Sequence, residues 1–489
     1  MADEKAALLQ QTSADGSTAV SPSPATSRRR SALQIAVMLI ASLTVLRLGF
    51  ILLYALPGPG SASIKSDASE THVAAAHRVL SANPLIDGHD DLLISLRAYY
   101  GNHIYANSTF RNKFEQGGLE GHLDIPRIKS GQLGGSFWSA FVPCPRNASD
   151  FSNTAYAPYV RATLEQLDLY NRLGILYPTY FTLTPNATAA EAAFASGSLI
   201  SPLAIEGLHQ IGNSAATLRL YHALGVRYAT LTWNCHNIYA DAAVVFNSAG
   251  NTVVAPPLHH GVSTAGRALI HEMNRLGMLV DLSHVSPDTM RDVLYGNHDT
   301  SAPPEWHGSL APPIFSHSSV KALCPHPRNV PDDVLHLLKK RNGVVMINFA
   351  PDFISCRTRE GEDPEASVPD FVDETNTLVQ VVRHVMYVGE LIGYDHVGLG
   401  TDFDGIPNTP RGLEGVDKFP DLVAELLRRG VSEQDAGKVV GRNVLRVWRE
   451  ADEVAARMAK EGWLPLEDDV AFPERSEDED YLWSYEQGW

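Results

Sequence analysis

The stretches LVDLSH at residues 279–284 and IFSH at residues 314–317 decide the predicted fold. Each is a short apolar run that ends in serine and histidine, as expected for a buried strand whose end reaches a polar site. His317 follows His284 by 33 residues (317 − 284). That spacing is close to one strand–helix–strand unit of about 30 residues, so we expect the two histidines on neighbouring strand ends.

The same pattern recurs along the chain. Further apolar runs that end in polar residues occupy 84–91, 203–207, 228–233, 344–349 and 397–402, and helical-looking stretches separate them. Strands that alternate with helices indicate a parallel sheet covered by helices. Because polar side chains follow so many strands, an α/β fold of the (β/α)8 TIM-barrel type is favoured over a doubly wound sheet. No linker-like break interrupts residues 71–463, which we expect to form one domain.

Five side chains at the predicted strand ends form a candidate metal-ligand set: His89, Asp91, Glu206, His284 and His317. In the sequence His89-x-Asp91, the two-residue period of a strand places both side chains on one face. A core or capping histidine bonded to a carbonyl explains any one of the histidines equally well. Ionisable groups at so many buried strand ends are costly, however, unless they are paired or bind metal. The set suits two zinc-like ions bridged by Glu206, which would share a hydroxide that attacks a carbonyl.

Asp402 follows the last predicted strand, in the sequence GLGTDFDG at 398–405. A carboxylate beside a two-metal centre is suited to carry a proton during hydrolysis. The alternative is a structural carboxylate in a turn, a common role for aspartate in such glycine-containing sequences.

The charge of the chain excludes one class of partner. Lys and Arg number 39 and Asp and Glu 56, which gives a net charge of −17 and argues against nucleic-acid binding. Residues 464–489 hold nine acidic residues and one basic residue, and they predict a solvated acidic tail. The alternative is that the aromatic residues of this tail dock on the domain.

The amino-terminal residues predict a membrane anchor. Residues 1–30 are rich in Ser, Ala, Thr and Pro and end in three arginines, which indicates a disordered cytosolic tail. Residues 31–57 are apolar and long enough to cross a ~30 Å hydrocarbon core as a transmembrane signal anchor. A cleaved signal peptide is the main alternative, and a buried core helix is a weaker one. Residues 58–70 are then a stalk rich in Gly, Ser and Ala.

This topology places the domain in a lumen or outside the cell. Three glycosylation sequons, at Asn107, Asn147 and Asn186, lie beyond the predicted span. All the cysteines also lie beyond it, and their even number allows two disulfides in an oxidising compartment.

Taken together, the motifs resemble the membrane dipeptidase (renal dipeptidase) family of binuclear zinc peptidases, in the amidohydrolase-like barrel class. The resemblance covers about residues 75–448. It rests on IDGHDD (86–91), HLDIPRIKSGQLGGSFWSAFVPC (122–144), IEG (205–207), GVRYATLTWNC (225–235), LVDLSHVS (279–286), IFSHSS (314–319), RNVPDD (328–333), GLGTDFDG (398–405) and GRNVLRVW (441–448). It implies a zinc-dependent dipeptidase with two Zn²⁺ per chain, small dipeptide substrates and a homodimer.

The resemblance also implies roles for single residues. His89 and Asp91 would bind one zinc, His284 and His317 the other, with Glu206 bridging them and Asp402 carrying the proton from the bridging hydroxide to the leaving amine. Arg328 matches the arginine that pairs with the free carboxylate of the substrate, which a guanidinium can grip through two parallel hydrogen bonds. A surface ion pair is the alternative for Arg328. Cys144 with Cys235, and Cys324 with Cys356, match the two disulfides of the family.

One position departs from the family pattern. Trp233 stands where the mammalian enzymes have a substrate-contacting histidine, and an indole cannot take up a proton. His236, three residues on, is a candidate replacement. An aromatic wall at Trp233 also favours a second hypothesis, a hydrolase of cysteinyl-glycine adducts or of another small amide. A third hypothesis is an inactive, metal-stabilised surface receptor, which would have no need for a proton carrier such as Asp402.

Overall fold

Residues 72–296 and 306–468 are described by the structure, a computed structural model. The predicted cytosolic tail, signal anchor and stalk lie outside these residues, as does the predicted acidic tail beyond residue 468. Within the two described ranges, no helix is both long and apolar enough to cross a membrane.

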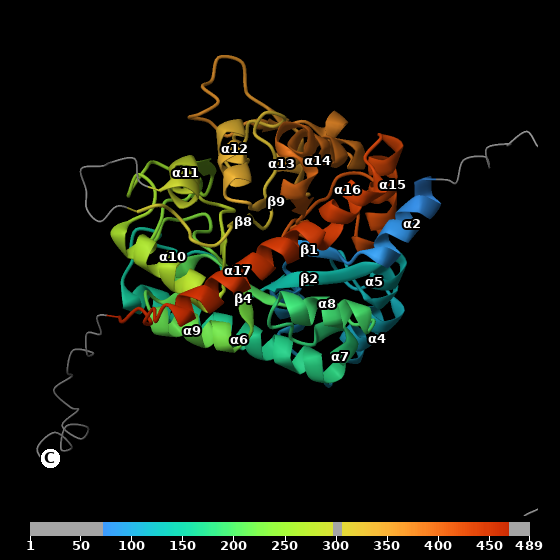
Figure 1. Cartoon of the computed structure of the whole chain (residues 1–489), viewed down its shortest axis with the longest axis horizontal. Coiled ribbons are helices and arrows are strands. Elements are labelled where there is room, and N and C mark those ends of the chain that lie inside the picture. Colours follow the sequence, from blue (N-terminus) through green and yellow to red (C-terminus); the bar gives the residue numbers. More distant parts are fainter. Residues whose placement is uncertain (1–71, 297–305, 469–489) are drawn as a thin grey trace, which may run out of the picture. The chain divides into compact units, whose positions relative to one another are not determined.

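The domain is built on a closed barrel of eight parallel strands, which confirms the predicted barrel (Figure 1). Neighbouring strands follow the order β1, β2, β3, β4, β7, β8, β9 and β12, and β12 returns to β1. Their bounds are β1 Leu85–Asp90, β2 Leu133–Ser139, β3 Leu203–Glu206, β4 Val226–Thr230, β7 Leu279–Asp281, β8 Ile314–Phe315, β9 Val344–Ile347 and β12 Val397–Leu399. Because all strands run parallel, their carboxyl ends meet at one mouth of the barrel.

Helices surround the barrel (Figure 1). They are α2 His72–Ala82, α3 Leu92–Tyr100, α4 Ser108–Gln116, α5 Ile125–Gly131, α6 Asn153–Leu176, α7 Pro178–Phe181, α8 Ala187–Ala195, α9 Ala215–Ala223, α10 Thr264–Leu276, α11 Pro287–Tyr295, α12 Asp332–Lys340, α13 Pro351–Ile354, α14 Leu378–Ile392, α15 Phe419–Arg428, α16 Glu433–Gly437 and α17 Asn443–Lys460. Many begin after a capping side chain; Ser263, for example, accepts a hydrogen bond from the Gly266 amide at the start of α10.

Two hydrophobic clusters lie on the two sides of the strands. In β3, Leu203 and Ile205 face the outer cluster beneath the helices, and Ala204 faces an inner cluster inside the barrel. The inner cluster includes Trp448 of α17, whose ring lies 5.4 Å from that of Phe137. Hydrophobic side chains from the strands and from α17 therefore fill the inner cluster.

The barrel closes where its first strand meets its last. β1 pairs with β12 at Asp87 and Leu399. The buried carboxylate of Asp87 accepts hydrogen bonds from the Thr401 amide at 2.7 Å and the Thr401 hydroxyl at 2.5 Å. This seam is therefore fixed by side-chain as well as backbone hydrogen bonds.

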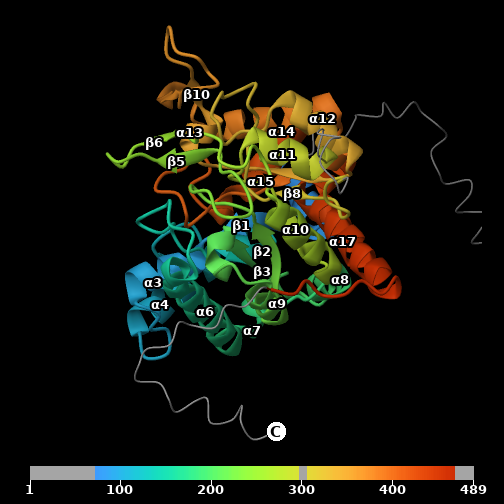
Figure 2. The same ribbon diagram turned by 90° about the vertical axis from the view of Figure 1, so that its left-hand side faces the viewer.

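Two hairpins project from the same side of the domain (Figure 2). They consist of β5 Val244–Phe246 with β6 Thr252–Val254, and β10 Cys356–Arg357 with β11 Asp370–Phe371. Each hairpin belongs to a long loop that follows a barrel strand at its carboxyl end, β4 in the first case and β9 in the second.

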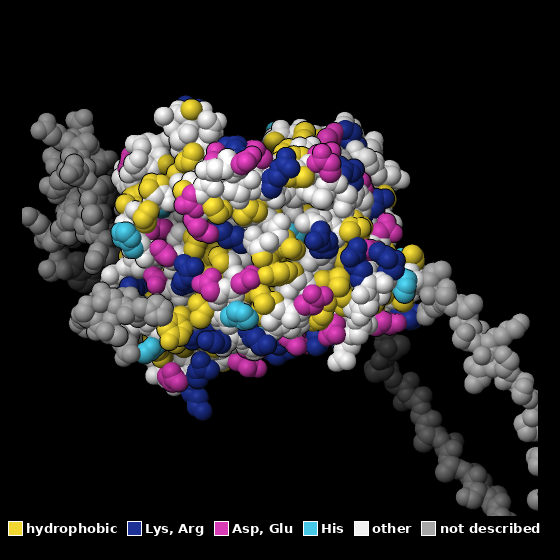
Figure 3. Space-filling model, turned by 90° about the horizontal axis from the view of Figure 1, so that it is seen from above, with side chains coloured by type: hydrophobic (Ala, Val, Ile, Leu, Met, Phe, Trp, Pro, Cys, Tyr) yellow, Lys and Arg dark blue, Asp and Glu magenta, His cyan; other side chains and the backbone are white. Residues whose placement is uncertain are grey.

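The face in Figure 3 carries acidic and basic side chains in alternation, with no broad area of one sign. The beginning of the predicted acidic tail is docked on the domain. Asp468 accepts hydrogen bonds from the amides of Ala215 and Ala216 at the start of α9, and Arg219 donates to the Leu466 carbonyl.

Candidate metal centre

The predicted ligands come from several strand ends that meet at the mouth of the barrel. Glu206 is the last residue of β3, and the alternation of the strand turns its side chain to the same side as Ala204, which faces the interior. His89 lies in β1, whereas Asp91 directly follows that strand and precedes α3. Their side chains still converge, since His89 Nε2 lies 3.3 Å from Asp91 Oδ2.

Glu206 lies at the centre of the cluster. One of its oxygens, Oε1, is 2.8 Å from His284 Nε2 and 3.3 Å from His317 Nε2. The other oxygen, Oε2, is 3.6 Å from His89 Nε2. Two ligand groups therefore share this carboxylate, one with His284 and His317 and the other with His89 and Asp91. The structure thus brings together all five predicted ligands, in the arrangement expected for a carboxylate that bridges two ions.

Each histidine is oriented by a hydrogen bond at its other nitrogen. His89 Nδ1 lies 2.6 Å from the hydroxyl of Tyr228, which itself donates to the Gly88 carbonyl. His284 Nδ1 lies 2.9 Å from Asn234 Oδ1. These oxygens accept a hydrogen bond from Nδ1–H, so Nε2 is the nitrogen that faces the carboxylates.

His317 is also oriented by a hydrogen bond at its Nδ1 atom. His317 Nδ1 lies 2.7 Å from Ser316 Oγ, and that hydroxyl donates to Asp281 at 2.6 Å. The hydroxyl therefore accepts from His317 Nδ1–H, which again leaves Nε2 toward Glu206. These orienting partners were not predicted from the sequence. Ser316 is the one of the three partners that could have been found from the sequence, because it directly precedes His317.

The charge states of His284 and His317 suit metal ligation. Burial and the nearby Arg328 lower the pKa of His284 to about 3, and burial together with His89 lowers the pKa of His317 well below its usual range. Both imidazoles are therefore neutral at pH 7, as metal ligation requires. Burial opposes a charge on His89, but Tyr228 and the nearby carboxylates raise its pKa well above the usual range.

Two buried atoms of the cluster, His89 Nε2 and Asp91 Oδ1, have no hydrogen-bond partner within residues 72–296 and 306–468. Unpaired polar atoms inside a protein are costly unless an ion or ligand satisfies them. The donor set of three imidazoles and two carboxylates is also one that zinc prefers. The residues present therefore fit a two-metal centre.

Asp402 lies beside the cluster, with a carboxylate oxygen within 4.8 Å of a ring nitrogen of His89 and of one of His317. Its Oδ2 accepts a hydrogen bond of 3.2 Å from the side-chain amide of Asn348. Burial raises the pKa of Asp402 to about 8, and nearby cations would shift it back toward the ionised form. Asp402 is thus placed to accept or donate a proton near neutral pH.

Two residues of the site have backbone conformations that are unusual for residues other than glycine. The φ angles are +67° at His284 and +65° at Asp402. The left-handed region costs such residues about 1 kcal/mol or more, and it persists where the surrounding structure and function require it. The backbone of Gly405 also lies close to the predicted ligand Asp91. A Cβ at this position would lie only 2.2 Å from Asp91 Oδ2, so a larger residue would displace that carboxylate.

Arg328 is a buried cation without a hydrogen-bond partner for its guanidinium nitrogens among the described residues. Its guanidinium carbon lies 5.1 Å from the centre of the Phe353 ring, and burial lowers its pKa to about 10, so it stays charged. A fully buried charge of this kind is costly unless a counterion binds it. Arg328 lines the same cavity as Glu206 and His284, so it offers a site for a carboxylate.

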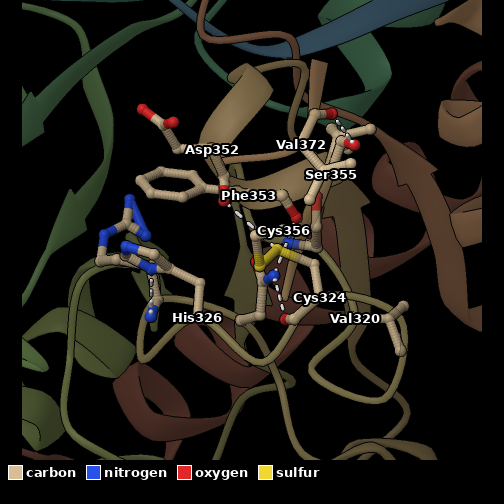
Figure 4. Close-up of a disulfide and its surroundings, with 12 residues drawn as sticks. Val320, Cys324, His326, Asp352, Phe353, Ser355, Cys356 and Val372 are labelled. Carbon is tan, nitrogen blue, oxygen red and sulfur yellow. Dashed lines mark hydrogen bonds between the residues drawn. A yellow bond between two sulfur atoms is a disulfide. The ribbon is translucent and has the colours of Figure 1, made fainter. Parts of the chain in front are cut away.

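The loop that carries Arg328 is joined to the α13 segment. Figure 4 shows the disulfide between Cys324 and Cys356, with Phe353 and His326 beside it. The side-chain amide of Asn329 donates to the carbonyls of both Cys324 and Phe353, at 2.8 Å each. The guanidinium and the ring beneath it are therefore held by a covalent link and by hydrogen bonds.

The cavity over the cluster has a volume of about 690 Å³, within the range of small-molecule sites. Asp402 and Trp233 also line it. His236 is placed away from this lining, with Nδ1 3.2 Å from Asp241 Oδ1 and 3.2 Å from the Ala242 amide nitrogen. Its proposed role as a replacement for the family histidine stays a prediction that this placement does not favour.

Both expected disulfides are present. Cys144 is bonded to Cys235 and Cys324 to Cys356, and no described cysteine is free. Each bond joins loops that follow barrel strands: β2 with β4 in the first case, and β8 with β9 in the second. The pairing expected from the family resemblance is confirmed.

The sequence and the fold match known proteins. Residues 73–462 match the family model described as membrane dipeptidase (peptidase family M19). Dipeptidase aclJ of Aspergillus oryzae is 45% identical over 406 residues, which are 82% of this chain and 85% of aclJ. Dipeptidase tcpJ of Claviceps purpurea is 42% identical over 384 residues, 78% of this chain and 80% of tcpJ.

Solved structures share the fold. A metallo peptidase of Rhodobacter sphaeroides, liganded with a phosphinate mimic of the dipeptide L-Ala-D-Ala, superimposes with a TM-score of 0.60 and 24% identity. The match covers 76% of this chain and 99% of that structure. A probable dipeptidase, PvdM of Pseudomonas aeruginosa, gives a TM-score of 0.63 at 19% identity, with 78% and 99% covered.

Proposed function

Because the chain belongs to the membrane dipeptidase family, peptidase family M19, and is a metal-dependent dipeptidase, we propose that it works with two zinc ions. His89 and Asp91 would hold one ion, His284 and His317 the other, and Glu206 both. The observation that carries this proposal is the convergence of three Nε2 atoms on the single carboxylate of Glu206. When bound, the ions would polarise the scissile carbonyl and lower the pKa of water.

The residues around the cluster would supply the remaining chemistry. Arg328 would bind the free carboxylate of the dipeptide and so place the only peptide bond over the cluster. Asp402 would accept a proton from the attacking water and deliver it to the leaving amine. Its hydrogen bond from Asn348 keeps one carboxylate oxygen oriented during that transfer.

Metal removal tests this function. We expect the purified protein to hold two zinc ions per chain and to hydrolyse members of a dipeptide panel. A chelator should abolish hydrolysis, and added zinc should restore it. Zinc-loaded protein that cleaves no dipeptide, or activity that persists after complete removal of metal, would contradict the proposal.

A substitution of Arg328 tests whether its guanidinium binds the free carboxylate of the dipeptide. Arg328→Lys keeps the charge but loses the planar pair of N–H donors, so KM for a dipeptide should rise about tenfold or more. The matched control is the same dipeptide with an amidated C-terminus. Wild type should cleave the amide less well than the acid, and the variant should discriminate much less between them. Equal discrimination by the two proteins would remove Arg328 from this role.

We also propose that the domain lies on the lumenal or extracellular side of a membrane, anchored by residues 31–57. The two disulfides support an oxidising compartment. Asn147 and Asn186 are exposed, and Asn107 and Asn186 cap helices through Oδ1, which leaves Nδ2 for a glycan. A peptide-N-glycosidase should lower the mass of the protein from its native host.

A homodimer is an expectation from the family, and the molecular mass of the protein in solution tests it.

A further inference from the structure

Three neighbouring aromatic side chains lie beside the cluster, and two of them, Phe141 and Trp233, line its cavity. These side chains, here called the aromatic wall, are Phe141, Trp233 and Phe246. The ring of Trp233 lies 4.8 Å from that of Phe141 in an edge-on arrangement and 5.9 Å from that of Phe246. It also lies 6.3 Å from the ring of His284. The aromatic wall therefore begins at a predicted metal ligand and extends to the exposed Phe246.

The aromatic wall is held in place by a disulfide. Phe141 and Trp233 belong to the loops after β2 and β4, and the Cys144–Cys235 bond joins these same loops. Trp233 is further fixed by a backbone bridge to Cys235. A surface that is ordered before binding loses little conformational entropy when a ligand contacts it. Phe141 and Trp233 are half-buried and line the cavity, so their rings are available to a ligand.

The loops of the aromatic wall and the loop that carries Arg328 follow strands on different sides of the barrel. In the circular order of the eight strands, β2 stands opposite β8, whose loop carries Arg328, and β4 stands opposite β12. Glu206, at the end of β3, lies between the two loops of the aromatic wall. A dipeptide that spans the mouth in this order, with its carboxylate on Arg328 and its carbonyl at the cluster, has its amino-terminal residue on the side of Phe141 and Trp233.

We propose that the aromatic wall is the subsite for the side chain of the amino-terminal residue. It selects dipeptides in which that side chain is aromatic or another bulky apolar group. Aromatic rings prefer the edge-on and offset contacts that Phe141 and Trp233 offer. This inference rests on the proposed dipeptidase function, because Arg328 and the metal cluster set the direction of the substrate.

Two pairs of dipeptides test the proposal. The N-terminal ratio is kcat/KM for Phe-Gly divided by that for Ala-Gly, and the C-terminal ratio is kcat/KM for Gly-Phe divided by that for Gly-Ala. In the zinc-loaded wild type the N-terminal ratio should be about 10 or more. Trp233→Leu and Phe141→Leu keep apolar bulk but remove the aromatic face. Both should bring the N-terminal ratio down several-fold and leave the C-terminal ratio within about twofold.

Phe371→Ala is the matched control, since Phe371 is another exposed aromatic residue that lines the cavity but belongs to the other hairpin. It should leave the N-terminal ratio within about twofold of wild type. The inference is wrong if Ala-Gly is cleaved but neither leucine variant changes the N-terminal ratio, or if the C-terminal ratio falls instead. If zinc-loaded wild type cleaves none of the four dipeptides, the proposed function itself fails.

Discussion

Glu206→Gln should abolish hydrolysis, with kcat/KM reduced by at least about 10⁴-fold, because metal ions contribute several kcal/mol to such reactions. The carboxylate of Glu206 faces both ligand pairs, with Oε1 toward His284 and His317 and Oε2 toward His89. An amide of the same size has no negative charge and only one oxygen, so it cannot bridge two cations. We therefore expect the variant to lose at least one ion per chain.

Metal analysis after dialysis and a kinetic assay measure this effect, and circular dichroism checks that the variant is folded. The matched control is Glu425→Gln on α15, where the carboxylate pairs with Arg428 and Arg429 away from the site. That variant should keep both ions and wild-type activity. A Glu206→Gln protein with two bound ions and more than about one hundredth of wild-type activity would rule out the bridging role.

Asp402→Asn should lower kcat by roughly 10²-fold or more while both metal ions remain bound. Burial raises the pKa of Asp402 to about 8, and its Oδ2 is held by the side-chain amide of Asn348. Asparagine fills the same space but cannot gain and lose a proton at neutral pH. The loss should therefore appear in turnover with little change in metal content.

Asp404→Asn is the matched control for this prediction. Asp404 lies two residues away, lines the same cavity and accepts a hydrogen bond from the His122 amide through Oδ1, which an asparagine oxygen can replace. Its kcat should fall less than about tenfold. If the Asp402 variant retains wild-type kcat, or if both variants lose the same factor, Asp402 is not the proton carrier.

The strand ends that carry chemistry could be predicted from the sequence because a buried apolar run that stops at an ionisable residue is a strong signal. Strand β2 was missed, since its sequence LGGSFWS at 133–139 contains two glycines and ends without an ionisable residue. The two hairpins were also missed because their strands are only two or three residues long.

Hydrogen-bond partners were harder to predict than ligands. Tyr228 orients His89 from 139 residues away, and a contact at that separation has no periodic or spacing signal. The same holds for Asn234 and His284, which are 50 residues apart. Cysteine pairing likewise came from the family resemblance, since four cysteines allow three pairings and their spacing favours none.

The seam between β1 and β12 joins the first and the last strand of the barrel, so the site can be completed only when nearly the whole domain has been synthesised. His89 and Asp91 belong to the first strand and its end, whereas Asp402 follows the last, and the Asp87–Thr401 hydrogen bonds join the two across 314 residues. During synthesis, His89 and Asp91 therefore emerge from the ribosome early, whereas Thr401 and Asp402, which complete the seam and the site, emerge late. We expect metal to be bound only after synthesis is nearly complete, so the nascent chain should be inactive until its barrel closes.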